Sequence, residues 1–493
     1  MRQHPHLYEV NARILLRRLS EKYRRPLTLT TIPDEEWQSL VRRGFDFVWL
    51  MGVWQRSPGA RKEALLNVAL RHEYDRVLPD WTEEDVAGSP YAVYNYQLDS
   101  ALGKPGELAE LRSKLNRLGL KLMADFVPNH LAFDHPWVSS HPEWFVQGKA
   151  SDVKSHPDWF FSPAKGVYLA HGRDPNFPSW SDTVQVNVYS RGLREAMTDE
   201  LLRVVGMVDG VRCDMAMLLL NDVFEQIWGG MLEGFHRPET EFWQDTTGQV
   251  KRQWPDSVFL AEVYWGYEWK LQQLGFDFTK DKVLYDRLRC STAEDVRGHL
   301  RADELFQRRS ARFIENHDEL RAVVAFGRER SMAAAVVLAT ILGLRVFHDG
   351  MLEGRRIRLP VQLVREPPEP PDTQLMHFYD RLLAITNAPA FHDGKWQLLE
   401  ASPVSEENLT YQNLLSWSWH YRGQSRIVVV NLSPEPAQGW LRLPPPSENA
   451  AKVIFLDELT GATYIRDPGE LRSRGLYVAL GPYQSHILDM TVG

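Results

Sequence analysis

The chain has 493 residues, 43% of them hydrophobic and 25% charged, with a formal net charge of -8 at pH 7. This length exceeds what a single hydrophobic core organises, so two or three domains are expected. The negative charge disfavours nucleic acid as a partner, and a count of only two cysteines, Cys213 and Cys290, excludes a disulfide framework.

The sequence carries no recognisable targeting or membrane signal. Its first ten residues, MRQHPHLYEV, lack an apolar h-region, and no uncharged apolar run approaches 18 residues. Together with the low cysteine count, this favours a cytoplasmic protein that does not associate with membranes. The sequence leaves the oligomeric state open.

Eight short apolar runs predict strands, at residues 6–10, 45–53, 120–127, 210–216, 258–265, 276–279, 311–318 and 344–350. Amphipathic segments between them, such as 106–119, 191–206 and 330–343, predict helices. Strands that are almost continuously apolar and alternate with helices indicate a parallel sheet covered by helices. Eight such units predict an α/β fold, a closed (β/α)8 TIM barrel.

Two stretches interrupt this alternation. Residues 131–186 are rich in His, Pro, Asp and Trp, and they are too long for a structureless loop in a compact domain. They predict a small domain inserted after the third strand. From residue 390 onward, short alternating strands separated by Gly and Pro predict a C-terminal antiparallel β-sandwich, residues 390–493. The barrel is then formed by residues 1–130 and 187–389.

Charged residues gather at the ends of four predicted strands, where barrels of this kind carry their chemistry. The four segments are ADFVPNH (124–130), GVRCDMA (210–216), LAEVYW (260–265) and FIENHDE (313–319). In the second, Arg212 and Asp214 are two residues apart and share one face of the strand. A single carboxylate at such a place is most simply a helix cap or the partner of an arginine. Four strand ends with carboxylates on one rim indicate an active site.

These four segments, in this order, resemble the signature regions of the α-amylase superfamily, glycoside hydrolase family 13. The resemblance covers almost the whole chain, including the barrel, the insert and the sandwich. It implies that Asp214 is the nucleophile, Glu262 the general acid/base and Asp318 a third carboxylate that holds sugar hydroxyls. It also implies substrate-binding roles for Tyr91, which would stack on the sugar, and for Asp125, His130, Arg212, His317 and Arg321.

The chemistry of glycoside cleavage fits this assignment. The reaction needs an acid for the leaving oxygen and an anion for the anomeric carbon, and carboxyl groups about 5–5.5 Å apart give retention through a covalent glycosyl-enzyme. Arg212 is expected to keep Asp214 ionised. The apolar neighbours of Glu262 are expected to raise its pKa and keep it protonated.

Several positions depart from the family pattern. Met217 and Leu218 replace the Lys or His with which many amylases hold the acceptor-side sugar, and Gly88 replaces an Asp that is frequent in exo-acting glucosidases. Gln185 replaces the aspartate of a calcium-binding segment, and the amide of Asn129 is a weak ligand for a hard cation. We therefore expect no calcium, no other metal and no cofactor.

Hydrolysis of α-1,4-linked glucans or maltooligosaccharides is the first functional hypothesis. The run NHDEL (316–320) is similar to trehalose synthase-type members, and DHPWVSSHPEWF (134–145) is similar to members that transfer maltosyl units. A transglycosylase or isomerase is thus the alternative. A non-catalytic sugar-binding barrel is the third reading, although such relatives usually lose a carboxylate that is present here. Trp54, Trp180 and Trp265 are candidates either for neighbouring sugar subsites or for the core.

Overall fold

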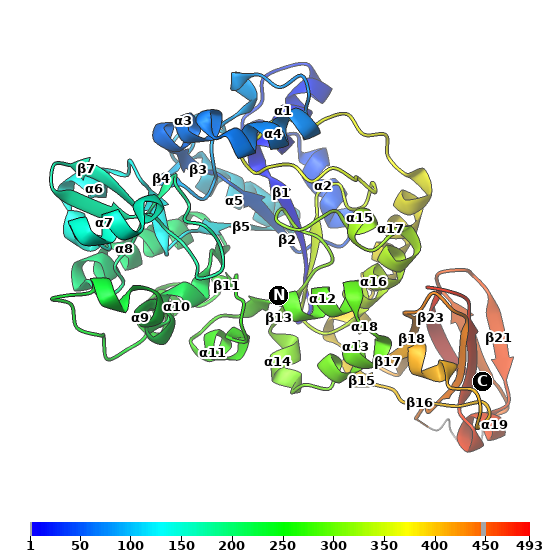
Figure 1. Ribbon diagram of the computed structural model, residues 1–493. Helices are drawn as coiled ribbons and strands as arrows, with labels where there is room; N and C mark the ends of the chain where they lie inside the picture. Colours follow the sequence, from blue (N-terminus) through cyan, green and yellow to red (C-terminus); the bar gives the residue numbers. More distant parts are fainter. Residues whose placement is uncertain (1, 445–449) are drawn as a thin grey trace.

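The computed structural model describes residues 2–444 and 450–493, and its centre is a closed parallel barrel of eight strands (Figure 1). The strands are β1 (His6–Asn11), β2 (Phe47–Met51), β5 (Lys121–Phe126), β10 (Gly210–Cys213), β11 (Val258–Ala261), β12 (Phe278–Lys280), β13 (Ser310–Arg312) and β14 (Leu344–His348). The barrel closes because β1 pairs with both β2 and β14, so that Leu7 lies between Phe47 and Val346. All eight predicted strands are present, and the predicted TIM barrel is confirmed.

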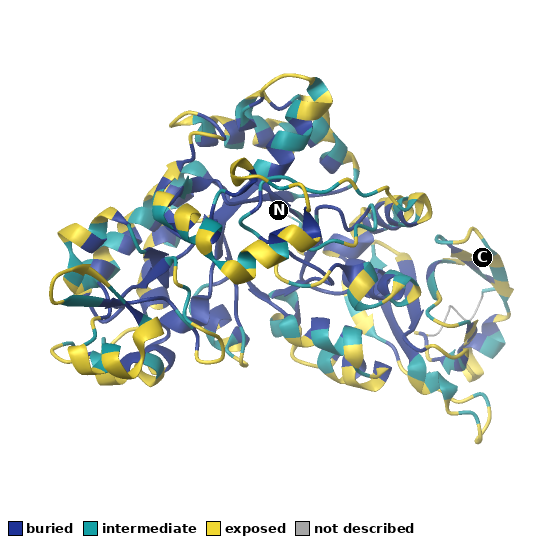
Figure 2. Cartoon of the chain, turned by 45° about the horizontal axis from the view of Figure 1, so that its top comes forward, coloured by how far each residue is buried: buried dark blue, intermediate teal, exposed yellow. Residues whose placement is uncertain are grey.

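Helices cover the outside of the barrel, where their outward faces are exposed (Figure 2). The larger ones are α1 (Ala12–Tyr23), α2 (Asp34–Arg42), α3 (Pro58–Leu66), α4 (Val68–Val77), α5 (Glu107–Leu118), α8 (Arg191–Met207), α9 (Asn221–Trp228), α10 (Phe242–Gln253), α12 (Lys282–Cys290), α13 (Ala293–Leu300), α16 (Arg328–Thr340) and α17 (Thr373–Thr386). The helices predicted at 106–119, 191–206 and 330–343 correspond to α5, α8 and α16. The start of α8 is fixed by Ser190, whose side chain accepts a hydrogen bond from the Leu193 backbone N–H.

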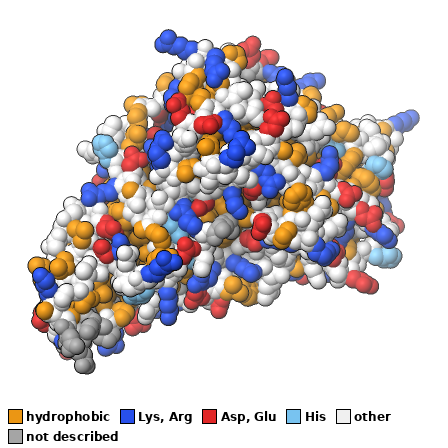
Figure 3. Space-filling model, turned by 180° about the vertical axis from the view of Figure 1, so that it is seen from behind, with side chains coloured by type: hydrophobic (Ala, Val, Ile, Leu, Met, Phe, Trp, Pro, Cys, Tyr) orange, Lys and Arg blue, Asp and Glu red, His pale blue; other side chains and the backbone are white. Residues whose placement is uncertain are grey.

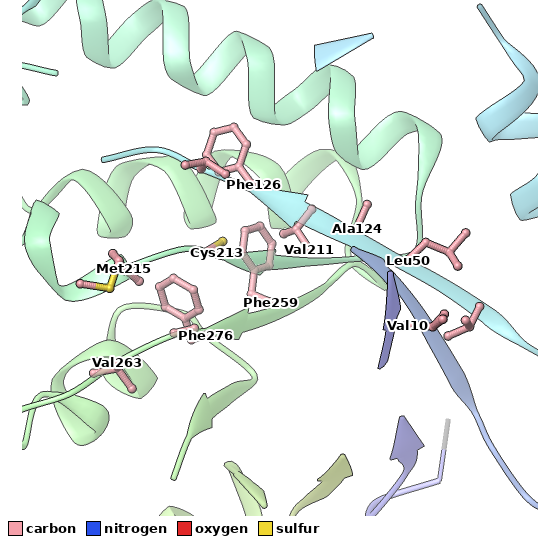
Figure 4. Close-up of a cluster of buried hydrophobic side chains, with 14 of the residues drawn as sticks. Val10, Leu50, Ala124, Phe126, Val211, Cys213, Met215, Phe259, Val263 and Phe276 are labelled. Atoms are coloured by element: carbon pink, nitrogen blue, oxygen red, sulfur yellow. The ribbon is translucent and has the colours of Figure 1, made fainter. Parts of the chain in front are cut away.

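The barrel strands contribute to two different cores. Val211 and Cys213 of β10 point outward with Phe126 and Phe259 and pack among helices (Figure 4). Apolar residues on the other face fill the barrel interior: Leu7, Phe47, Met123, Leu260, Phe278 and Val346. Because side chains of a strand alternate, the outward direction of Val211 and Cys213 directs Arg212 to the interior.

The segment between β5 and α8 is built from short elements beside the barrel, at the left of Figure 1. It contains the antiparallel pairs β6 (His130–Ala132) with β9 (Thr183–Gln185) and β7 (Phe160–Ala164) with β8 (Val167–Ala170), and the helices α6 (Pro136–Ser140) and α7 (Ala150–Ser155). The β6–β9 pairing places His130 opposite Gln185 and brings the two ends of the segment together. The exact boundaries of a separate domain here stay a prediction.

The C-terminal part consists of two antiparallel sheets. One has the order β15 (Lys395–Leu398), β17 (Leu414–Tyr421), β18 (Gln424–Asn431), β23 (Ser485–Val492), β20 (Val453–Asp457) and β21 (Thr463–Arg466); the other contains β16 (Ala401–Ser402), β19 (Ala437–Leu441) and β22 (Leu476–Leu480). Strand β18 is buried on both faces, since Val428 belongs to the core shared with the barrel and Val429 to the sandwich core. The Trp419 indole N–H donates to the Thr340 carbonyl of α16 at 2.7 Å. The predicted C-terminal β-structure is confirmed, and it packs against the barrel.

The surface seen in Figure 3 intersperses Lys and Arg with Asp and Glu. An intermixed face of this kind offers no extended positive field to a phosphate backbone, in keeping with the net charge of -8. Among the helices formed by residues 2–444 and 450–493, none combines the length and apolar character needed to cross a bilayer.

Three histidines are fully buried beside the starts of β1 and β14. His4, His6 and His392 are all 0% exposed, and the rings of His6 and His392 are 4.9 Å apart. The Arg345 guanidinium lies 3.2 Å from His6 Nε2. Burial, reinforced by the charge of Arg345, lowers the pKa of His4 and His392 to about 2 and that of His6 well below its usual value.

These histidines predict that the protein loses stability as the pH falls below about 6.5, the pKa of an unfolded histidine. Below that pH the unfolded chain binds protons that the native state excludes, and each such histidine lowers the unfolding free energy by about 1.4 kcal/mol per pH unit. Urea denaturation between pH 7 and pH 5 should therefore show a shallower decline for His392→Gln than for the parent protein. The exposed His72 provides the control, and equal slopes for His392→Gln and His72→Gln would contradict the prediction.

Candidate active site

Charged side chains replace apolar ones on the inner face of the barrel where the strands end. In β11 the inward residue Leu260 is followed two positions later by Glu262, and in β12 Phe278 is followed by Lys280. Because residues two apart share a face of a strand, the inner face of each strand changes from an apolar core residue to a charged residue at the strand's end. The buried members of this ring are Glu9, Asp125, Arg212, Glu262 and Lys280.

Arg212 is shared by several buried carboxylates. Its Nη1 lies 2.5 Å from Asp214 Oδ1 and 3.8 Å from Asp125 Oδ1, and its Nη2 lies 2.7 Å from Glu262 Oε2. The guanidinium also lies over the Tyr91 ring, 5.2 Å from its centroid. Asp214 and Glu262 therefore meet at the two arms of one guanidinium, and the buried cation is compensated by more than one anion.

Asp214 and Glu262 line the same cavity, which has a volume of about 590 Å³. Asp318 completes the three predicted carboxylates in its wall, together with the predicted Tyr91, His130, Arg212 and His317. The wall also contains the aromatic side chains of Phe177, Trp180, Tyr264 and Trp265. The cavity has the volume of a small-molecule site, and its wall combines charged and aromatic side chains.

Glu9 fixes the orientation of His317. The Glu9 carboxylate lies 2.6 Å from His317 Nδ1 and accepts the His317 backbone N–H at 3.1 Å. This leaves His317 Nε2 to face Tyr91 Oη at 2.7 Å and Asp318 Oδ2 at 3.3 Å. Burial disfavours the charged imidazole, but Asp318 and Glu9 outweigh it and raise the pKa of His317. Glu9 was not among the predicted residues, although its position two residues after the inward Leu7 indicates that its side chain points into the barrel.

Lys280 is a second cation at the carboxylates that the sequence prediction missed. Its Nζ lies 2.9 Å from Tyr264 Oη, 3.3 Å from Glu262 Oε1 and 3.6 Å from Asp318 Oδ2. The Tyr264 hydroxyl also donates to Glu262 Oε1 at 2.9 Å. The sixth strand was predicted to end at Thr279, one residue too early, so Lys280 was not considered as an inward side chain.

The protonation expected for the two central carboxylates has to be corrected. Burial favours neutral Glu262, but Arg212, Lys280 and the Met215 N–H outweigh it and hold the pKa of Glu262 well below its usual range. Burial raises the pKa of Asp214, and repulsion from Glu262 adds to this effect, despite Arg212. The sequence analysis assumed that Arg212 pairs only with Asp214 and that the neighbours of Glu262 are apolar. In the structure the cations favour Glu262.

Two predicted substrate ligands lie behind the cavity wall. Asp125 Oδ2 accepts the Gly52 backbone N–H at 3.1 Å beneath Arg212. Arg321 pairs with buried Glu315 at 2.6 Å and donates to the Ile357 carbonyl at 3.1 Å. Neither side chain lines the 590 Å³ cavity. Their contacts support the wall and the loop after β14, and direct contact with substrate is not supported for either.

The three tryptophans separate into core and cavity. Trp54 is 1% exposed, and its indole donates to the Asp125 carbonyl at 2.6 Å, so it belongs to the core. Trp180 lies in the cavity wall with its ring 4.8 Å from that of His130. Trp265 is 44% exposed and lines the cavity with a positive φ of 63°. A bulky side chain rarely adopts this backbone conformation, which is concentrated at functional sites.

The residues at the family's calcium position do not form a suitable site. Gln185 Nε2 donates to the Asn129 carbonyl at 2.9 Å, to Asn129 Oδ1 at 3.1 Å and to the Val186 carbonyl at 3.1 Å. The two hydrogens of this amide are thus shared among the three oxygens, and Gln185 brings a neutral amide where a calcium site would need a carboxylate. Within residues 2–444 and 450–493, no cluster of three or more His, Cys, Asp or Glu side chains is arranged to hold a metal.

We expect removal of calcium to have no effect on the protein. Dialysis against EDTA should leave the melting temperature and the activity unchanged within error, because the Gln185 amide already occupies the oxygen acceptors that a cation would need. Differential scanning fluorimetry with added CaCl₂ after dialysis is the matched control. A rise in melting temperature that saturates with calcium would contradict this expectation.

Comparisons with known proteins bear on the family and the fold of the chain. The family model "Alpha amylase, catalytic domain" matches residues 44–351. The α-amylase MalA of Haloarcula japonica is 26% identical over 271 residues, which cover 53% of this chain and 36% of that protein. The α-1,4-glucan:maltose-1-phosphate maltosyltransferase 1 of Streptomyces coelicolor is 23% identical over 452 residues, 86% of this chain and 59% of that one. The chain therefore spans less than two thirds of the length of either relative.

Solved structures share the fold over the whole chain. The maltogenic α-amylase AmyB of Thermotoga neapolitana superposes with a TM-score of 0.70 at 19% identity, covering 100% of this chain and 99% of the other. An α-amylase of Geobacillus thermoleovorans, solved with acarbose, superposes with a TM-score of 0.67 at 16% identity and covers 99% of this chain and 98% of its own. At these identities the likeness establishes the architecture.

Proposed function

Because the chain belongs to the α-amylase family, we propose that it is an enzyme that hydrolyses α-1,4-linked glucans or maltooligosaccharides with retention of configuration. One observation carries the proposal. Asp214 and Glu262 are held by the two arms of Arg212, at 2.5 and 2.7 Å, in the wall of one cavity. A nucleophile and an acid/base that face one sugar are what retaining cleavage requires.

In the proposed reaction Asp214 attacks the anomeric carbon while Glu262 donates a proton to the leaving oxygen. The resulting glycosyl-enzyme is attacked by a water molecule whose proton returns to Glu262. Asp318 and His317, both in the cavity wall, are placed to bind hydroxyls of the same sugar. Tyr91 lies between Arg212 and His317 and offers its ring and hydroxyl to that site.

The cavity offers aromatic surfaces to neighbouring sugars. Phe177, 68% exposed, and Trp180 come from the loop between β8 and β9, and Trp265 comes from the loop after β11. Aromatic side chains offer flat apolar surfaces, and the apolar faces of pyranose rings can pack against them. The predicted acceptor-side positions Met217 and Leu218 are at most 1% exposed and do not line the cavity. The acceptor side is thus assigned to the loop that carries Trp265.

Transglycosylation is the second candidate, and Trp265 favours it. This residue is three positions after the proposed acid/base and is exposed to the cavity. An aromatic platform on the leaving-group side retains an acceptor sugar, which competes with water for the glycosyl-enzyme. The relatives described above include both an amylase and a maltosyltransferase, so we propose both outcomes for the same site.

Incubation with maltotriose tests the proposal. Glucose and maltose as the only products support hydrolysis, whereas longer oligomers or trehalose support transfer. Proton NMR of the first product formed gives the stereochemistry, and the α-anomer is expected. An initial β-anomer would refute the retaining mechanism, and no product from any defined maltooligosaccharide would refute an active enzyme of this class.

We also propose a cytoplasmic location. Both cysteines are unpaired, Cys213 in the core and Cys290 at the surface, and a reducing compartment preserves thiols in this state. Fractionation of the native host with an antibody to the protein tests the location.

A further inference from the structure

Both oxygens of the Glu262 carboxylate are fully engaged by donors. Oε2 faces Arg212 Nη2 at 2.7 Å and the Met215 N–H at 3.0 Å. Oε1 faces the Tyr264 hydroxyl at 2.9 Å and Lys280 Nζ at 3.3 Å. Four donors fill the acceptor sites of a carboxylate. The Tyr264 hydroxyl can also accept, as it does from Lys280, but the guanidinium, the ammonium and the backbone N–H can only donate, so these groups favour the ionised form of Glu262.

Lys280 is the donor that acts on Glu262 and leaves the proposed nucleophile alone. Arg212 contacts Asp214 and Asp125 as well as Glu262, whereas the carboxylate partners of Lys280 are Glu262 and Asp318. The ammonium group is held over the rings of Tyr264 and Phe313, at 5.1 and 5.4 Å. A lysine so placed between two carboxylates and two aromatic faces remains charged.

Lys280 lies beneath the catalytic cavity and not in its wall. It is 8% exposed and lines a separate space of about 30 Å³ inside the barrel, together with Trp49 and Phe313. A ligand in the 590 Å³ cavity would meet Glu262 and Asp318 first. Any effect of Lys280 on the reaction therefore passes through these two carboxylates and through Tyr264, which also lines the cavity.

We propose that Lys280 is a positioning residue that ties Glu262 to Asp318 and favours the ionised form of Glu262, so that it sets the upper end of the pH range in which Glu262 can act as the acid. This inference rests on the proposed function. In the first half-reaction a proton leaves Glu262 for the glycosidic oxygen, and in the second a proton from water or an acceptor hydroxyl returns to Glu262. Favouring the ionised form makes Glu262 a stronger acid in the first step and a weaker base in the second, and it lowers the pH above which Glu262 lacks the proton that the first step needs.

The groups that face Glu262 come from every neighbouring element. They are Arg212 and the Met215 N–H from β10 and the turn after it, Asp214 from the same turn, His130 from β6, Tyr264 after β11, Lys280 from β12, and His317 and Asp318 after β13. Arg212 and His317 remain in a Lys280→Met variant. The change is thus confined to one of the two cations in direct contact with Glu262, and it should weaken the preference for the anion without abolishing it.

The test is the pH profile of kcat/KM on maltotriose. Activity falls at high pH as Glu262 loses the proton needed for the first step. Lys280→Met should move this alkaline limb upward by about one to three pH units, the range produced by one neighbouring cation. Lys280→Arg should keep the limb near its original place. The control is Lys251→Met. Lys251 lies on α10 and its Nζ is 2.6 Å from Asp277 Oδ2, and this variant should leave the alkaline limb in place.

A substrate whose leaving group needs no proton distinguishes an effect of Lys280 on the acid role of Glu262 from a general loss of activity. With an activated aryl α-maltoside, the alkaline limb should be the same in the parent and in Lys280→Met. Tyr264→Phe removes the hydroxyl that bridges Lys280 and Glu262 and should shift the maltotriose limb in the same direction by less, which gives a second measurement if Lys280→Met folds poorly. Reduced activity with an unmoved limb in both variants would overturn the role of Lys280. An inactive parent enzyme would instead overturn the proposed function.

Discussion

Replacing Asp214 by Asn will reduce kcat on maltooligosaccharides by on the order of 10⁴-fold or more, the scale of loss when a nucleophile is removed. The amide has nearly the shape of the carboxylate but cannot form the glycosyl-enzyme. The fold should survive, because Arg212 keeps Glu262 as a partner at 2.7 Å and burial already raises the pKa of Asp214 and so disfavours its charged form. Removing a charge that the site only partly stabilises should leave the melting temperature unchanged or raise it.

Asp209→Asn is the matched control for this experiment. Asp209 directly precedes β10, at the end of the strand opposite Asp214, and pairs with Arg112 at 2.8 Å. This variant should lose some stability and keep its activity, since its carboxylate is remote from the cavity. If Asp214→Asn retained more than a few per cent of the parent's kcat while circular dichroism showed native structure, Asp214 would not be the nucleophile.

The barrel was predictable because its strands follow a simple rule. Strands packed between helices and an apolar interior must be hydrophobic on both faces, so they stand out as continuous apolar runs. The same rule concealed parts of the C-terminal sheets. Strand β16 has two residues, and β21 alternates between exposed and half-buried positions, so neither has an apolar run that would identify it. A pattern of hydrophobicity finds strands that form a core and misses those that only extend a sheet.

The three central carboxylates were predictable, and the charges around them were not. Asp214, Glu262 and Asp318 follow recognisable segments at the ends of apolar runs. Lys280 follows Thr279 without any motif, and only the register of β12, whose Lys280 is aligned with Ala311, makes it an inward side chain. The protonation of Glu262 depends on that one lysine and on the second arm of Arg212. Such properties arise from contacts between strands and cannot be derived from the neighbours of Glu262 in sequence.

Arg212→Met will lower the free energy of unfolding by up to about 3–5 kcal/mol at pH 8, the cost of leaving buried charges without their partner. Asp125, 1% exposed, and Asp214, 5% exposed, would lose their nearest cation. Glu262 would keep Lys280 at 3.3 Å. Methionine preserves much of the side-chain volume and the contact with Tyr91, so the effect is expected to be electrostatic and not one of packing.

The pH dependence of this loss distinguishes electrostatics from packing. Without Arg212 the folded-state pKa values of Asp125 and Asp214 rise further above the unfolded value of about 4. The loss relative to the parent is therefore small while Asp125 and Asp214 are protonated in both folded proteins, and it grows as the pH rises above the parent's own folded pKa values, which are already raised. Urea denaturation at pH 5, 7 and 8 should show an increasing difference between variant and parent. Asp214→Asn combined with Arg212→Met should cost less than the two single changes added together, because it removes one of the unpaired charges. A loss that is the same at all three pH values, or strictly additive, would mean that Arg212 acts as a packing residue and that the carboxylates around it are stabilised by other groups.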